Sequence, residues 1–138
     1  MFHILEPEVA GGWGQGTEAD TTVHPPVVRR LVYQFDGWLG DDLLETFPCF
    51  VVTDRLAQAI RASDLTGCEL GPVEVVKSEL FEELHPGREI PNFHRLYAVG
   101  DAGEDDFCVD NQRLRVSDAA LALLGRFNIE HCDVHAGT

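Results

Sequence analysis

The chain has 138 residues and a formal charge of −14, from 10 Lys and Arg against 24 Asp and Glu. This length predicts a single domain, 1–138, and the hydrophobic fraction of 44% suffices for a packed core. The charge repels phosphate groups, which argues against direct binding of nucleic acid. The apolar runs are too short to span a membrane and the first residues lack a signal-peptide pattern, so we expect a cytoplasmic protein without membrane association.

The N-terminal third alternates β-forming segments with glycine- and proline-rich ones. Residues 1–7 contain Phe, Ile and Leu and predict a first strand. The glycines and the proline pair within 9–26 disfavour regular structure, so we expect a flexible arm there. Residues 27–38 are rich in β-formers and predict a strand. The acidic residues at the start of 41–46 favour one helical turn.

A strand–helix–strand pattern occurs twice. The first copy, 50–76, has an apolar strand ending at Thr53, a helical face and an extended return. The second copy, 113–134, repeats this order with Ser117 in the place of Thr53. Hydroxyl groups at these positions accept hydrogen bonds from the free amides of a first helical turn, which predicts two N-caps. We infer an internal repeat of structure, and the few identical positions leave common ancestry open.

The segments around these copies complete the expected fold. Residues 78–84 predict a short helix, residues 92–99 a strand, and residues 101–106 an acidic turn. The last residues, 135–138, should fray. These elements predict an α+β fold, with a mixed, largely antiparallel sheet of about five to seven strands and two main helices packed on it. The two similar strand–helix–strand units would lie side by side.

No catalytic motif is recognisable, and we expect a protein that is not an enzyme and carries no cofactor. The four cysteines have no CxxC spacing, which disfavours a zinc ribbon and predicts buried thiols. The densest group of metal-ligand types is His131, Asp133 and His135, which would share one face of a strand. An enzyme that binds a metal or a small ligand on this face is an alternative hypothesis.

Three surface features favour a protein partner. Trp13 and Trp38 lie in glycine-rich contexts and are candidate interface anchors, unless they fold back on the core. The acidic segment 101–110 contains no basic residue, and it would suit a basic groove or else form a solvated loop. Its candidate partner-binding residues are Asp101, Glu104, Asp105 and Asp106.

Residues 50–56 and 65–73, with their echo in 114–118, resemble a cassette of small bacterial proteins grouped with the immunity proteins of polymorphic toxin systems. The resemblance covers only the two repeat copies, and its motifs are structural. It implies an α+β protein that binds and blocks a partner toxin, and it brings no catalytic residues.

The leading hypothesis is therefore a non-enzymatic inhibitor of a basic cognate toxin, acting through an acidic surface. A third hypothesis is an accessory or oligomerising domain. The sequence does not define the oligomeric state.

Overall fold

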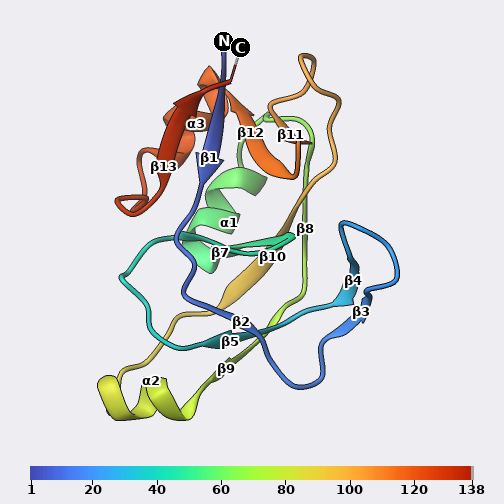
Figure 1. Cartoon of the computed structure of the whole chain (residues 1–138). Coiled ribbons are helices and arrows are strands. Elements are labelled where there is room, and N and C mark those ends of the chain that lie inside the picture. Colours follow the sequence, from blue (N-terminus) through green and yellow to red (C-terminus); the bar gives the residue numbers. More distant parts are fainter. Residues whose placement is uncertain (138) are drawn as a thin grey trace.

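The structure is a computed structural model that describes residues 1–137, and within them the chain forms 3 helices and 13 strands (Figure 1). Most strand pairs are antiparallel, which confirms the predicted α+β class. The strands form four sheets rather than the one sheet that the sequence predicted. No helix in this range is long and apolar enough to cross a membrane.

One four-stranded sheet contains the strands of the first repeat copy up to residue 71, in the order β6-β7-β10-β8 with all neighbours antiparallel. Its strands are β6 (Leu43–Thr46), β7 (Cys49–Thr53), β10 (Phe93–Ala98) and β8 (Cys68–Gly71). Helix α1 (Asp54–Arg61) follows β7 directly and buries Leu56, Ala57 and Ile60. These apolar residues lie on one side of the helix, which explains why it packs against the sheet.

A second four-stranded sheet contains the other copy, in the order β11-β12-β1-β13, again antiparallel throughout. Its strands are β11 (Phe107–Asp110), β12 (Arg113–Ser117), β1 (Phe2–Glu6) and β13 (Asp133–Ala136). Helix α3 (Asp118–Leu124) follows β12 and buries Ala120, Leu123 and Leu124. Ser117 accepts a hydrogen bond from the Ala120 amide, which confirms it as an N-cap.

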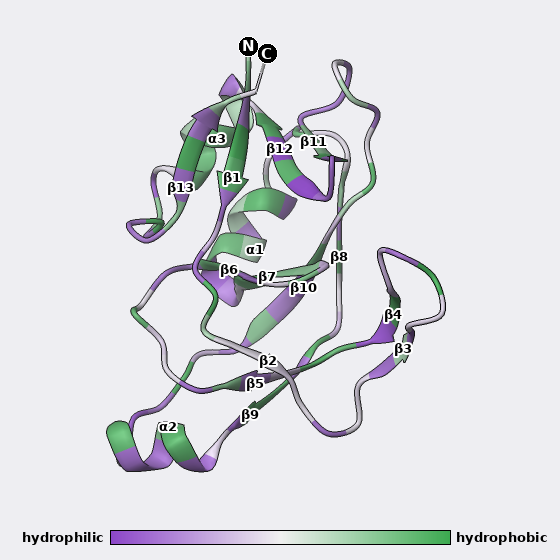
Figure 2. Cartoon of the chain, viewed as in Figure 1, coloured by the Kyte–Doolittle hydropathy of each residue, from purple (hydrophilic) through white to green (hydrophobic). Residues whose placement is uncertain are grey.

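The two sheets correspond strand for strand, and the correspondence includes strands outside the two copies seen in the sequence. In the central strands, His94 pairs with Val52 in one sheet and His3 pairs with Val116 in the other. The central strand of the second sheet is β1, from the opposite end of the chain. Both helices contribute to one hydrophobic core, which also contains Leu5 and Leu96. In Figure 2 the hydrophobic residues of α1, α3 and β1 appear as green segments.

A second layer packs on the other face of the first sheet. It consists of a three-stranded sheet, a two-stranded sheet and helix α2 (Glu79–Leu84). In β6, Leu43 belongs to the first core and Leu44 to the second, so both faces of the sheet are covered. The remaining strands are β2 (Gly11–Trp13), β5 (Val32–Phe35), β9 (Glu74–Lys77), β3 (Glu18–Asp20) and β4 (Val27–Arg30).

Several local predictions were wrong. The expected arm over 9–26 contains β2 and β3, because each finds an antiparallel partner, β5 and β4. The expected helical turn at 41–46 contains β6 instead, since Leu43 and Leu44 must face opposite cores. Thr53 occupies an N-cap position, but its hydroxyl donates to Asp42 rather than capping the helix. Strand β13 extends to Ala136, beyond the expected fraying point; Thr138 lies outside the described residues.

Candidate functional site

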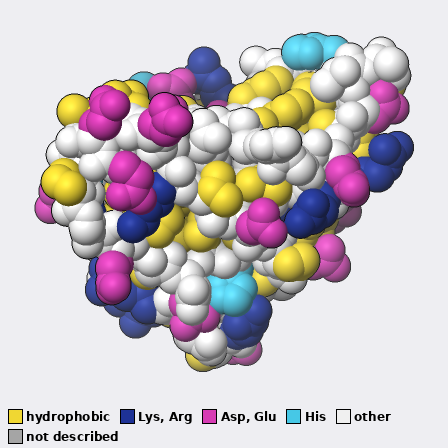
Figure 3. Space-filling model, turned by 90° about the horizontal axis from the view of Figure 1, so that it is seen from below, with side chains coloured by type: hydrophobic (Ala, Val, Ile, Leu, Met, Phe, Trp, Pro, Cys, Tyr) yellow, Lys and Arg dark blue, Asp and Glu magenta, His cyan; other side chains and the backbone are white. Residues whose placement is uncertain are grey.

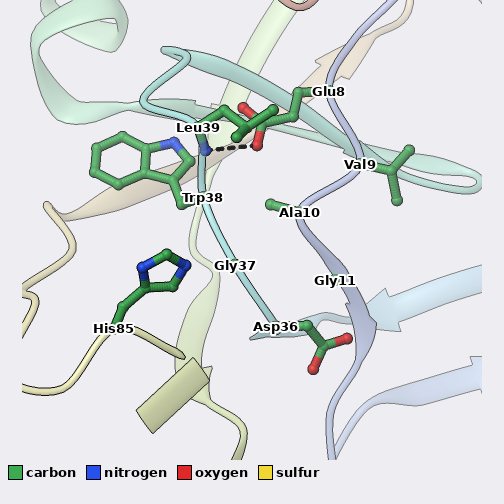
Figure 4. Close-up of a pocket in the computed structure, with 9 residues that line it drawn as sticks. All are labelled: Glu8, Val9, Ala10, Gly11, Asp36, Gly37, Trp38, Leu39 and His85. Carbon is green, nitrogen blue, oxygen red and sulfur yellow. Dashed lines mark hydrogen bonds between the residues drawn. The ribbon is translucent and has the colours of Figure 1, made fainter. Parts of the chain in front are cut away.

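A hollow of about 440 Å³ opens where the chain leaves β1 and where it leaves β5 (Figure 4). Residues 8–11 form one side and residues 36–39 the other, with His85 beside them. In Figure 4 the carboxylate of Glu8 lies at one end and that of Asp36 at the other. The hollow therefore lies between two acidic side chains.

Backbone hydrogen bonds fix the two sides of the hollow. The amides of Asp36 and Gly37 donate to the carbonyl of Ala10, at 2.9 and 3.2 Å. Gly11 is required by this close approach, because a Cβ atom there would lie 1.8 Å from the Gln34 carbonyl oxygen. The hollow is thus a preformed feature of the β2–β5 pairing.

Trp38 forms a wall of the hollow and is held in place on three sides. Its indole nitrogen donates to the Asp41 carbonyl at 2.9 Å, and its ring packs edge-on against Phe93. The Arg88 guanidinium lies 5.0 Å from the ring centroid and donates to the Trp38 carbonyl. Trp13, the other candidate anchor, lies in β2 and is 36% exposed.

The rim of the hollow is apolar and open to solvent. Val9 and Leu39, on opposite sides, are 65% and 63% exposed. Val9 and Leu39 thus give the hollow one exposed apolar side chain on each side, which together form a small apolar contact surface.

Glu8 contributes a buried carboxylate at the inner end of the hollow. It is only 7% exposed, and its Oε2 atom accepts a hydrogen bond from the Leu39 amide at 2.8 Å. Its Oε1 atom is buried and has no hydrogen-bond partner among residues 1–137. Burial raises the pKa of this carboxyl group above its usual value.

Asp41 and His131 lie next to Glu8. Asp41 is fully buried, and its carboxylate accepts from the His131 amide at 2.9 Å and contacts the His131 Nδ1 atom at 2.8 Å. The hydrogen bond to Asp41 raises the pKa of the His131 ring. One ligand atom from each of Glu8, Asp41 and His131 lies within 4.8 Å of the others. These residues come from three distant segments, and among the residues that the structure describes they form a group that could hold a metal ion.

The structure does not assemble the ligand group expected from the sequence. His131 precedes β13 and turns to Asp41, whereas Asp133 and His135 lie in β13 itself. The Nε2 atom of His135 lies 3.5 Å from the Oε2 atom of Glu6, so this ring faces β1. Sequence reasoning found His131 but missed Glu8 and Asp41, because nothing in their local sequence indicates that they are buried together.

The acidic segment 101–110 divides into outward and inward carboxylates. Asp101 and Glu104 are exposed. Asp105 accepts from the Asp101 amide at 2.7 Å. Asp106 accepts from the Ser117 hydroxyl at 2.6 Å and the Thr66 amide at 2.9 Å, so its carboxylate is part of the fold.

The four cysteines are free thiols. Burial raises the pKa of Cys68 to about 11 and that of Cys132 to about 12, which leaves little of the nucleophilic thiolate at neutral pH. Comparisons of the chain with protein-family models, curated proteins and solved structures found no match.

Proposed function

We propose that this chain is a non-enzymatic binding protein, an immunity-type inhibitor that blocks a basic cognate toxin. The observation that carries the proposal is the hollow, with Val9 and Leu39 exposed on its rim and Asp36 at its outer end. The apolar rim supplies contact area, and the half-buried carboxylate of Asp36 favours a partner with basic side chains.

The charge of the whole chain supports the same type of partner. An excess of 14 negative charges accelerates encounter with a basic surface. Figure 3 shows a face on which hydrophobic side chains lie among charged ones, an arrangement found in protein interfaces. The resemblance of the repeat copies to immunity proteins is consistent with this role.

The acidic turn contributes to steering in this proposal. Asp101 and Glu104 are the exposed carboxylates, whereas Asp106 is bound to Ser117 and Thr66. Substituting Asp101 and Glu104 by Lys should therefore slow association and weaken its dependence on salt, without disturbing the fold.

Capture of the partner from native lysate at low and high salt, with mass spectrometry, tests the proposal. Wild-type protein should retain one basic protein in stoichiometric amount, and a Val9→Asp/Leu39→Asp variant should lose it. The matched control is Val109→Asp/Val134→Asp. It adds the same charge at two exposed apolar residues outside the hollow, which are 48% and 43% exposed. Equal capture by both variants would exclude the hollow as the interface.

A growth assay then tests inhibition rather than binding. The captured protein, expressed alone, should arrest growth, and co-expression of this chain should restore it. A captured protein that is harmless alone would overturn the toxin-inhibitor role. A wild-type bait that retains nothing at either salt concentration would overturn the binding role as well.

A further inference from the structure

We propose that Glu8, Asp41 and His131 bind a divalent first-row transition-metal ion, with zinc as the probe. The three side chains offer ligand atoms within 4.8 Å of one another. Carboxylate oxygen and imidazole nitrogen are both common ligands of such ions. Val9 and Leu39, which form the rim of the hollow, contribute no ligand atom to this site. The metal site can therefore be tested separately from the proposed inhibitor function.

The unpartnered oxygen of Glu8 is the second observation that points to a ligand. Its side chain is more than nine-tenths buried, yet within the described part of the chain Oε1 has no hydrogen-bond partner. A buried carboxylate oxygen without a partner is costly. Because Oε1 is sealed from solvent, a side chain of another protein does not reach it, whereas a single ion between the three residues does.

Charge balance favours a cation at the same place. Glu8 and Asp41 are both buried acids, 7% and 0% exposed, and they lie within reach of one histidine. Buried charges in proteins are paired or bind metals. A divalent ion compensates both carboxylates at once.

The geometry needs only small side-chain rotations. Zinc binds nitrogen and oxygen ligands at about 2.0–2.2 Å, so ligand atoms around one ion lie within about 4.4 Å of each other. In the metal-bound form Asp41 Oδ1 and His131 Nδ1, now 2.8 Å apart, would give up their hydrogen bond, move slightly apart and each bind the ion. The proton that Nδ1 shares with Asp41 then leaves to solvent, and the imidazole that binds the ion through Nδ1 carries its one remaining proton on Nε2, which takes it from solvent where the ring was neutral.

The site would join three parts of the chain. Glu8 follows β1, Asp41 precedes β6, and His131 precedes β13. Ligands from such distant segments make metal binding part of the folding free energy. The role that we assign to the ion is therefore structural, as a clamp between the two similar sheets and the hollow.

Titration calorimetry and thermal unfolding of the full chain, first treated with a chelator, test this proposal. We expect one zinc ion per chain, and a rise in Tm of about 5 °C or more at a hundredfold excess over Kd. Magnesium at the same concentration should bind far more weakly, because the site contains an imidazole.

Two variants and one control define the site. Glu8→Gln should retain or raise the metal-free Tm, because it removes a buried charge, and should lower zinc affinity at least tenfold. His131→Ala should also abolish the zinc-dependent shift. The control Asp133→Asn/His135→Ala should bind zinc as the wild type does. Absence of stoichiometric binding, loss of binding in the control alone, or full binding by Glu8→Gln would each overturn the proposal.

Discussion

His3 and His94 occupy equivalent positions in the two similar sheets, and each bonds the first residue of a helix. The Nε2 atom of His3 lies 2.7 Å from Asp118, and that of His94 lies 2.8 Å from Asp54. Each histidine thereby links the central strand of its sheet to the start of the helix that follows the neighbouring strand. An acid at that end of a helix is also favoured by the helix dipole.

These two pairs predict a loss of stability in acid. The hydrogen bond from His3 lowers the pKa of Asp118, and that from His94 lowers the pKa of Asp54. A carboxyl group with a lowered folded-state pKa stabilises the fold above its unfolded-state pKa, near 3.9, and this contribution is lost as the pH falls through the folded value. The free energy of unfolding, measured with urea across this pH range, should fall less steeply with decreasing pH for Asp54→Asn/Asp118→Asn than for the wild type. An unchanged slope would contradict this account.

Asp42 and Asp106 occupy equivalent positions ahead of the two repeat copies, but they should differ in how much each stabilises the fold. Asp42 is 2% exposed and binds Thr53, Arg55 and the Asn128 amide, so Asp42→Ala should cost about 3 kcal/mol of unfolding free energy. Its counterpart is Asp106, which is only half-buried. Asp106→Ala should cost about 1–2 kcal/mol, since it loses hydrogen bonds to Ser117 and Thr66.

The control for this pair is Asp101→Ala, at an exposed acid, which should stay within about 0.5 kcal/mol of wild type. Chemical denaturation monitored by circular dichroism gives all three values. A reversed order of Asp42 and Asp106 would contradict the burial argument.

Tyr33 holds the hollow together from within. Its fully buried hydroxyl accepts from the Ala10 amide and donates to the Glu45 carbonyl, both at 2.9 Å. Tyr33→Phe leaves two buried backbone groups unpaired and should cost about 1–3 kcal/mol. Hydrogen exchange should also show faster exchange of the Ala10 amide. Unchanged protection of that amide would show that the hollow does not depend on Tyr33.

The thiols should be unreactive while the chain is folded. Because the pKa values of Cys68 and Cys132 are raised to about 11 and 12, alkylation by iodoacetamide near neutral pH should be slow. Adding urea should expose all four cysteines to rapid modification. Mass spectrometry of the labelled peptides would identify any cysteine that reacts early in the native protein, which would contradict the prediction for that residue.

Local sequence signals predicted the elements whose causes are local. Ser117 caps its helix as expected, and Ser78 caps α2 in the same way, since an N-cap needs only a hydroxyl before a helical face. The extension of the repeat was also visible, because residues 2–5 and 93–96 share Phe, His and Leu in the same order. The sequence analysis missed this match because residues 2–5 lie before the copy 113–134, whereas residues 93–96 lie after the copy 50–76.

The site could not be predicted in the same way. Asp41 and Asp42 resemble the acidic start of a helix, but they are buried by residues that lie far along the chain, His131 and Asn128. Glu8 is buried because β6 runs beside it, through the bridge to Leu44. Tertiary contacts, and not local sequence preference, therefore decide whether these acids are buried.

The position of β1 has a consequence for the order of assembly. The first sheet draws all its strands from a contiguous stretch, residues 43–98, whereas the second needs the N-terminal strand to meet β12 and β13. Contacts between distant residues form slowly, so the first sheet should close earlier. The Gly137 amide donates to the Phe2 carbonyl at 2.9 Å, so a short linker could join the two ends. A circular permutant in which β1 follows β13 would then carry the two copies in tandem, each drawing all its strands from one contiguous stretch of chain.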